Sequence, residues 1–258
     1  MRNAEEFYKG LHKADDAYSA GTYYFKSLYR SSVLRCWLQE RQGSKLRILD
    51  VGCGKGLFAL NFVRELRAHW NFSDIAVTGT DLIRSPGDFF EEVDPGFRFV
   101  QHDADGKALP FGDRGFDFLS CNHVLEHIFE TEQLLREFRR VLHPGGLCLI
   151  SVPNLSAWIN RAASLFAGQP LGSELGTEKV TYGFWPSFLQ RKLEPFRPSG
   201  HIRDFTPRGL RDLTAHCGFK TVGWWPQSHG VVARLGTWAG RNIGILLQPH
   251  GSDSGKDN

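Results

Sequence analysis

Three glycines alternate with other residues in the segment LDVGCGKG (49–56), between an apolar run and a helical pattern. Glycines Gly52, Gly54 and Gly56 would let the backbone approach a ligand that side chains exclude. A dinucleotide fingerprint reads G-x-G-x-x-G, whereas here the spacing is G-x-G-x-G with leucine at position 57. Asp50, just before the loop, would repel a pyrophosphate but favour a ligand carrying an ammonium and a sulfonium. The segment therefore predicts a site for a cationic ligand, with a purely structural turn as the alternative.

Two further acids follow the next apolar runs. Asp81 ends the segment VTGTD, and a carboxylate at the end of a second strand can accept hydrogen bonds from both ribose hydroxyls. Asp103 lies in QHDA, where it could accept from an adenine amino group while the N–H of Ala104 reaches a ring nitrogen. A lone Asp after a strand is also a common cap or turn residue. Spacing after the glycine loop favours a ligand-binding role for Asp81.

Regular alternation of strand and helix patterns would place these residues at one edge of a sheet. Strands are predicted at 46–51, 75–80, 97–101, 116–120 and 147–152, with helices at 27–39, 57–66 and 132–142. The segment HPGG (143–146) should end the last of these helices. Thr206-Pro207 begins a helix that ends at Gly218, and strands follow at 220–225 and 243–247. Such βαβ units with right-handed crossovers predict a doubly wound α/β sheet.

Composition narrows the class of protein. The 258 residues are 41% hydrophobic and 23% charged, enough for one sizeable core. A net charge of +3 does not make a nucleic-acid footprint, so no nucleic-acid partner is expected. The five cysteines are scattered with no C-x-x-C pair, which favours a reducing compartment. The first residues have no apolar signal region and no run is long enough for a transmembrane segment, so we expect a cytoplasmic protein.

The chain resembles the class I S-adenosylmethionine-dependent methyltransferases, of the group that includes small-molecule and ubiquinone-type methyltransferases. The segments that carry the resemblance are LDVGCGKG, GTD, HDADGKALPFGDRGFDFLSCNHVLEHI and LREFRRVLHPGGLCLISVPN, and more loosely HIRDFTPRGLRDLTAHCGFK. The resemblance implies a Rossmann-like, seven-stranded, mostly parallel sheet with one antiparallel strand near its end. It also implies S-adenosylmethionine as the cofactor.

The resemblance further implies a set of cofactor-binding residues, with Cys121 to His123 beside the transferable methyl group. The set comprises Asp50, Gly52, Cys53, Gly54, Asp81, Leu82, Asp103, Ala104, Cys121 and Asn122. One departure is RSPG (84–87), where relatives usually begin a regular helix. This departure leaves the part of the cofactor site that would contact the adenine ring without a predicted structure.

The segment HVLEH (123–127) spells H-x-x-E-H, a zinc-protease signature. Its flanks match the methyltransferase pattern and no zinc-supporting scaffold is evident, so no metal site is predicted. His123 and His127, together with His201, are instead candidate general bases, because histidine titrates near neutral pH. A purely hydrogen-bonding role for these histidines remains the alternative.

Residues 153–205 form an irregular insertion, which is typical of a lid or substrate wall. Its candidate acceptor-binding residues are Asn154, Tyr182, Trp185 and Arg203. Between Arg191 and Asp212, six basic residues face three acidic ones. A phosphate or carboxylate on the acceptor would suit this excess, but a solvated charged face is the favoured explanation. An apolar acceptor is also open.

Together these patterns predict an N-terminal helical cap (1–44), one methyltransferase domain (45–250) and a polar, disordered tail (251–258). The predicted reaction transfers a methyl group to an O or N atom of a small-molecule acceptor, through proximity and orientation with optional help from a base. Two alternatives are an oxidoreductase with a nucleotide cofactor and a non-catalytic S-adenosylmethionine-binding module. The missing third fingerprint glycine and Asp50 argue against the oxidoreductase.

Overall fold

The computed structural model describes residues 28, 31–85, 87–184, 198–227 and 240–250. Most of the predicted N-terminal cap, the 251–258 tail and the candidate residue Trp185 lie outside these ranges. Within the described part of the cap, helix α3 (Ser32–Gln39) begins after Ser31, whose side chain accepts from the N–H of Leu34. The domain boundaries themselves remain predictions.

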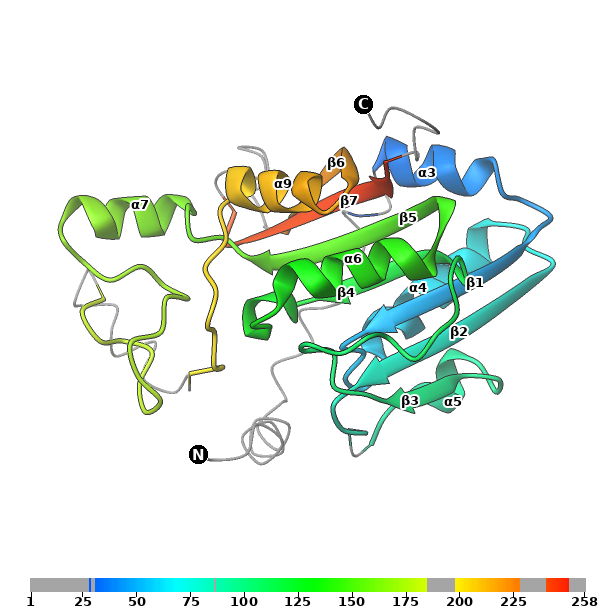
Figure 1. Cartoon of the computed structure of the whole chain (residues 1–258), viewed down its shortest axis with the longest axis horizontal. Helices are drawn as coiled ribbons and strands as arrows, with labels where there is room; N and C mark the ends of the chain where they lie inside the picture. The colour runs from blue at the N-terminus through cyan, green and yellow to red at the C-terminus, as the bar shows by residue number, and fades with distance from the viewer. Residues whose placement is uncertain (1–27, 29–30, 86, 185–197, 228–239, 251–258) are drawn as a thin grey trace, which may run out of the picture.

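Seven strands form one sheet in the order β3-β2-β1-β4-β5-β7-β6 (Figure 1). The strands are β1 (Lys45–Val51), β2 (Asp74–Asp81), β3 (Arg98–Gln101), β4 (Phe116–Asn122), β5 (Leu142–Pro153), β6 (Phe219–Gln227) and β7 (Asn242–Pro249). Strand β7 runs antiparallel to both β5 and β6, and every other pairing is parallel. The predicted doubly wound, mostly parallel sheet with an antiparallel strand near its end is confirmed.

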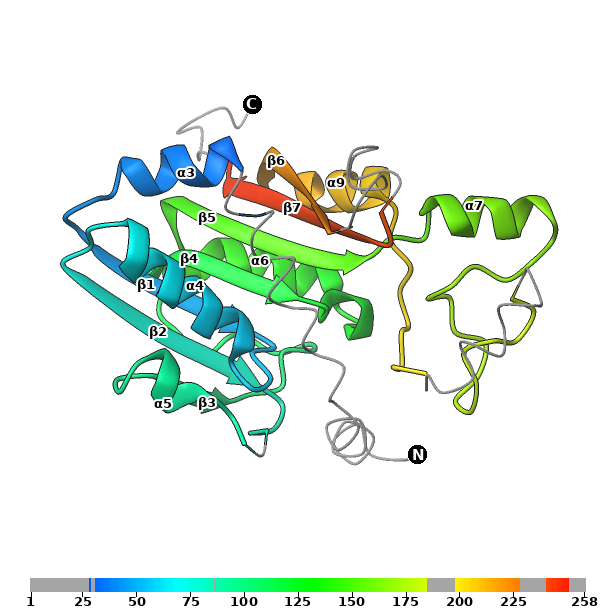
Figure 2. The same ribbon diagram turned by 180° about the vertical axis from the view of Figure 1, so that it is seen from behind.

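Helices cover both faces of the sheet, as Figures 1 and 2 show from opposite sides. Helix α6 (Thr131–Val141) and helix α9 (Pro207–His216) pack on one face, where Leu49 and Val51 point. Helix α3 and helix α4 (Leu57–His69) pack on the other, where Leu46 and Ile48 point. Because side chains of a strand alternate between faces, the apolar run in β1 serves both cores. This arrangement places the carboxyl end of β1 between β2 and β4, in the interior of the sheet.

One strand boundary was predicted wrongly. Helix α6 ends at Val141, but β5 begins directly at Leu142 and includes HPGG, which we expected to be a connecting turn before Leu147. The register between β4 and β5 shifts between Phe116 and Phe118. At Gly146 a Cβ atom would lie 2.8 Å from the carbonyl oxygen of His143 and 3.0 Å from that of Asp117. The glycine therefore permits a close approach of backbones at an irregular start of the strand.

The insertion projects beyond the carboxyl ends of the parallel strands (Figure 1). It carries helix α7 (Trp158–Leu165), whose Asn160 donates to the carbonyls of Asn154 and Leu171 and accepts from the N–H of Leu171. Both carboxylate oxygens of Glu174 accept hydrogen bonds from residues 199–201. These contacts give the described part of the insertion a defined path over the edge of the sheet where the candidate site lies.

No helix in the part of the chain that the structure describes is both long and apolar enough to cross a membrane.

Candidate cofactor and methyl-transfer site

The glycine loop closes directly onto the second strand. The N–H groups of Gly52 and Cys53 both donate to the carbonyl of Thr80, at 2.8 and 3.1 Å. Gly52 and Gly54 have φ angles of 71° and 52°, in the left-handed region that favours glycine. The loop is therefore built from backbone hydrogen bonds and glycine geometry, and its position relative to the end of β2 is fixed.

Asp81 joins the loop to the end of β2. Its Oδ2 accepts from the N–H of Gly54 at 2.8 Å, and its Oδ1 accepts from the N–H of Leu82 at 2.7 Å. Carboxylate oxygens offer about four acceptor positions in all, so this pair of hydrogen bonds does not exhaust the group. The predicted cofactor-binding residues Gly54, Asp81 and Leu82 are thus brought together at one point.

The glycines of the loop differ in their surroundings. Among the described residues, a Cβ atom at Gly54 would meet nothing within 4 Å, whereas one at Gly52 would overlap the side chain of Val124. Gly52 is thus packed against the turn after β4, and Gly54 faces open space. A backbone that presents an open surface next to an acceptor carboxylate suits a cofactor carrying hydroxyls and a positive charge.

Asp50 lies beneath the loop and is 2% exposed. Burial raises the pKa of its carboxyl group to about 7, against the lowering effect of a hydrogen bond from Ser120 Oγ at 2.6 Å and with a further increase from the charge of Asp81. A cationic ligand nearby would favour the ionised form. Sequence reasoning missed Ser120, although a hydroxyl inside the apolar run FDFLSCN was a signal.

The two cysteines predicted in the cofactor site direct their thiols elsewhere. Cys53 packs against β2, since a Cβ atom at Gly79 would lie 2.8 Å from its sulfur. Cys121 is fully buried in the core beneath α6. Burial raises the pKa of both thiols well above the usual range. Any contact of Cys53 or Cys121 with the cofactor must therefore come from the backbone.

On the adenine side, the carboxylate of Asp103 is engaged locally. Its Oδ1 accepts from the N–H of Asp105 at 3.1 Å, and its Oδ2 pairs with Lys107 at 3.1 Å. Ala104 packs against the core. Among the described residues after β2, the first helix is the four-residue α5 (Phe90–Val93). The adenine contacts of Asp103 and Ala104 remain predictions.

Polar atoms without a partner indicate where a ligand fits. Asn122 accepts from Ser151 Oγ at 2.9 Å, but its buried Nδ2 has no hydrogen-bond partner among the described residues. The buried Nε2 of His102 likewise has none there. Buried donors are nearly always satisfied in folded proteins, so a bound group at the end of β4 would complete the site. Sequence reasoning named Asn122 and missed His102.

The three candidate bases gather around one carboxylate. His123 Nδ1 lies 3.2 Å from Oε1 of Glu126, which is in the single turn η2 (Leu125–His127). His201 Nε2 lies 4.0 Å from the same oxygen, and the rings of His127 and His201 are 5.0 Å apart. The pKa of Glu126 stays below its ordinary value despite burial, because His123 hydrogen-bonds to it. The site was predicted without Glu126, which proves to be its centre.

The candidate acceptor-binding residues are less concentrated. Asn154 is 1% exposed, and its side chain donates to the carbonyl of Gly240 and accepts from Ser156, which favours a structural role. Arg203 donates to the carbonyl of Phe129 at 2.8 Å, close to η2. Tyr182 is 43% exposed on the insertion. Acceptor binding by Asn154, Tyr182 and Arg203 remains a prediction, and Trp185 lies outside the described residues.

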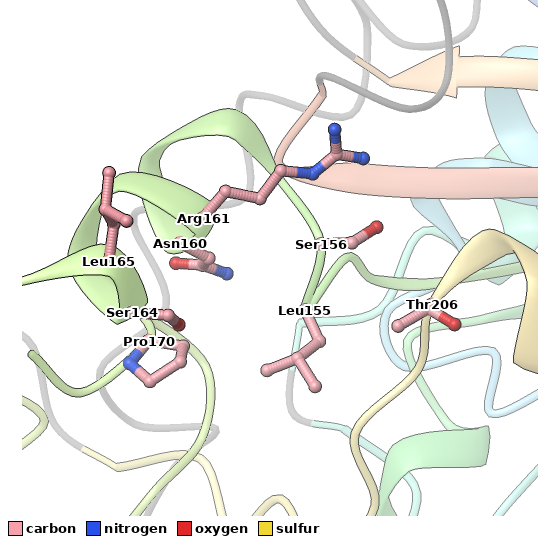
Figure 3. Close-up of a pocket in the computed structure, with 8 residues that line it drawn as sticks. All are labelled: Leu155, Ser156, Asn160, Arg161, Ser164, Leu165, Pro170 and Thr206. Atoms are coloured by element: carbon pink, nitrogen blue, oxygen red, sulfur yellow. The ribbon is translucent and has the colours of Figure 1, made fainter. Parts of the chain in front are cut away.

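A separate pocket of about 540 Å³ lies within the insertion (Figure 3). Its lining comes from α7, from the segment after β5 and from Thr206, comprising Leu155, Ser156, Asn160, Arg161, Ser164, Leu165, Pro170 and Thr206. None of these residues belongs to the glycine loop or to the histidine cluster. The pocket is therefore distinct from the site at the end of β1.

Comparison with known proteins agrees with this geometry. A methyltransferase-domain family model matches residues 22–223. A ubiquinone biosynthesis O-methyltransferase of Pseudomonas fluorescens is 25% identical over 81% of this chain and 75% of its own length. A ubiquinone/menaquinone biosynthesis C-methyltransferase of Azotobacter vinelandii is 30% identical over 72% of this chain and 71% of its own length.

Among solved structures, the 1,6-didemethyltoxoflavin-N1-methyltransferase of Burkholderia thailandensis, with bound S-adenosylhomocysteine, has a similar fold. The TM-score is 0.54 at 16% identity, over 95% of this chain and 86% of that one. At this identity the likeness concerns the fold alone. The family match covers most of the chain, and Asp81 hydrogen-bonds to the glycine loop. The chain therefore belongs to the methyltransferase-domain family and is a class I S-adenosylmethionine-dependent methyltransferase.

Proposed function

We propose that this enzyme methylates an O or N atom of a small-molecule acceptor that binds between the glycine loop and the histidine cluster. The observation that carries the proposal is the hydrogen bond between His123 and Glu126, directly after β4. Val124, in the same turn, packs against Gly52 of the cofactor loop. The side chain of Val124 thus connects the turn that carries His123 to the cofactor loop.

His123 is the best placed of the three candidate bases. Its side chain is 31% exposed, against 14% for His201. Its Nδ1 faces the carboxylate of Glu126, which assigns the proton to Nδ1 and makes Nε2 the basic nitrogen. A buried carboxylate behind an imidazole orients the ring and stabilises the imidazolium that forms on proton transfer.

When bound, S-adenosylmethionine supplies an electrophilic methyl group on a sulfonium. The chain's own residues hold and orient the reactants: Asp81 and the Gly52–Gly54 loop on the cofactor side, and the insertion on the acceptor side. His123 would take the proton from the acceptor hydroxyl or amine at Nε2. Exact placement of reactants supplies most of the acceleration in such reactions, and a base typically adds about 10²–10⁴-fold.

The names of the relatives support a small acceptor, since both act in quinone biosynthesis, one as an O-methyltransferase and one as a C-methyltransferase. Arg203 beside η2 could pair with a phosphate or carboxylate on the acceptor. An apolar acceptor would suit the exposed aromatic and aliphatic side chains Trp158, Leu165, Phe166 and Tyr182. A small-molecule partner rather than nucleic acid, and a cytoplasmic location, are part of this proposal.

The test is release of S-adenosylhomocysteine from purified enzyme given pools of phenols, aliphatic alcohols, amines and carboxylic acids. We expect one pool to stimulate release, and His123→Gln to lower kcat about 10²-fold or more on that acceptor. His143→Gln, at an exposed position in β5, is the matched control and should retain full activity. Binding of S-adenosylmethionine with no release of S-adenosylhomocysteine in any pool would instead support a non-catalytic binding module.

A further inference from the structure

Glu126, His127 and His201 come together from two distant parts of the chain. Glu126 and His127 are in η2 after β4, whereas His201 lies in the segment that leaves the insertion. One ligand atom from each lies within 4.8 Å of the others. This set differs from the H-x-x-E-H pair of the sequence, because His201 replaces His123, whose φ of 55° places it outside any helix.

The two carboxylate oxygens of Glu126 differ in their contacts. Its side chain is 1% exposed, and Oε1 faces His123. The second oxygen, Oε2, is buried and has no hydrogen-bond partner among the described residues. A buried, ionised carboxylate oxygen without a donor or a cation is strongly unfavourable, so the native protein should place a positive group there.

In both His127 and His201, Nδ1 hydrogen-bonds to a backbone carbonyl. His127 Nδ1 lies 3.1 Å from the carbonyl of Gly200, and His201 Nδ1 lies 3.1 Å from the carbonyl of Gly172. A carbonyl can only accept, so in each ring Nδ1 carries the proton and Nε2 presents the lone pair. Backbone carbonyls that orient imidazoles in this way commonly accompany metal ligands. Glu174 further fixes the segment by accepting from the N–H groups of Gly200 and His201.

We propose that Glu126 Oε2, His127 Nε2 and His201 Nε2 form a binding site for a divalent transition-metal cation such as Zn²⁺. Two imidazoles and one carboxylate are a common three-ligand set for zinc, with a fourth position open to water or another ligand. Ligands of a tetrahedral zinc ion lie about 3.3 Å apart, so the three groups need to move by roughly 1 Å each.

The cation would link η2 to the insertion. The N–H groups of Ile202 and Arg203 already donate to the carbonyl of Glu126, at 2.9 and 3.1 Å. A metal ion bound to the side chains of Glu126 and His201 would reinforce the same junction. The site leaves His123 outside the ligand set, while His123 Nδ1 contacts the other oxygen of the same carboxylate, Oε1. No metal was predicted here, because the flanks of HVLEH match the methyltransferase pattern and no zinc-supporting scaffold was evident; His201 is remote from that segment in the sequence.

The test is a titration of the metal-stripped, full-length protein with Zn²⁺ alone, by calorimetry and by competition with a colorimetric chelator. We expect one equivalent to bind with a Kd of micromolar or lower and to raise the Tm. His201→Ala and Glu126→Gln should each weaken binding at least tenfold. His216→Ala, at an exposed position in α9, and Cys36→Ser, which removes an exposed thiol, should bind as the wild type does.

Zinc that binds equally to the wild type and to His201→Ala would overturn the proposal, and so would a lack of saturable binding. Because Glu126 is buried, Glu126→Gln could unfold, so its circular dichroism is compared with that of the wild type first. His201→Ala carries the test if that variant fails. X-ray absorption at the zinc edge provides a second reading: two imidazoles in the first shell are expected, and sulfur ligation would contradict the site.

Discussion

Asp81 Oδ2 lies 2.8 Å from the backbone nitrogen of Gly54, so that the carboxylate predicted to bind the cofactor also holds the cofactor loop. Its other oxygen accepts from the N–H of Leu82. The loop and the end of β2 therefore form one unit. A substitution at Asp81 should disturb both the hydrogen bonds to the ligand and the shape of the loop.

Replacing Asp81 with Ala should lower the affinity for S-adenosylhomocysteine by roughly ten- to a hundred-fold, because hydrogen bonds to a charged group contribute about 1.5–3 kcal/mol. Asp74→Ala is the matched control: it lies at the other end of the same strand, in an exposed ion pair with Lys45. Calorimetry on both variants checks the prediction. Equal affinities for the two variants would reduce Asp81 to a turn residue.

Gly54→Ala should separate ligand binding from folding. Gly54 and Gly43 both have positive φ angles, and a Cβ atom at either would meet nothing within 4 Å in the described part of the chain. Each substitution should therefore lower the free energy of unfolding by about 1 kcal/mol through backbone strain alone. Only Gly54→Ala should also weaken S-adenosylhomocysteine binding, because its methyl group would occupy the space above the loop. Unchanged affinity in Gly54→Ala would place the cofactor elsewhere.

Asp50 should make the stability depend on pH. Its pKa is about 7 in the folded protein, against an ordinary value of 3.8. Between these values the folded state binds more protons than the unfolded state, so the free energy of unfolding falls as the pH rises from about 4 to about 7. Asp50→Asn should remove this contribution and flatten the dependence. Urea unfolding at pH 5 and pH 7.5 tests this. If the free energy of unfolding changes equally between the two pH values in wild type and variant, Asp50 titrates normally.

Tyr182→Phe should alter acceptor kinetics while leaving cofactor affinity nearly unchanged. The tyrosine is exposed on the insertion, away from the glycine loop proposed to bind the cofactor. A rise in KM alone would indicate that Tyr182 binds the acceptor equally in the ground and transition states, and a fall in kcat alone would indicate an orienting role. If neither constant changes on the acceptor found by screening, this part of the insertion is not the substrate wall.

Local patterns were sufficient to predict most of the fold. The strand at 46–51 corresponds to β1 (Lys45–Val51), and the helix begun by Thr206-Pro207 corresponds to α9, with Thr206 accepting from the N–H of Gly209. The start of β5 could not be predicted in this way. HPGG has the composition of a turn, and only pairing with β4 keeps it in the sheet.

The candidate site was predictable where it depends on positions at strand ends and not where it depends on side-chain direction. In β4, which is buried on both faces, composition does not show that the thiol of Cys121 points into the core. The grouping of Glu126 with His201 depends on the path of the insertion, which no periodicity describes. Ser120 is a hydrogen-bond partner of the predicted residue Asp50 and belongs to no motif. Glu126 belongs to HVLEH, but its contact with His201 joins segments far apart in the sequence, so short-range spacing could not identify it.

The central claim is that the glycine loop of Gly52 and Gly54, together with Asp81 at the end of β2, binds S-adenosylmethionine. Isothermal titration of the purified protein with S-adenosylhomocysteine tests it most directly. The measurement is made on the wild type and on Asp81→Ala, with NAD as the competing cofactor. We expect one S-adenosylhomocysteine per chain, weaker binding in the variant and no comparable binding of NAD. Tighter binding of NAD than of S-adenosylhomocysteine, or an affinity unaffected by Asp81→Ala, would contradict the account.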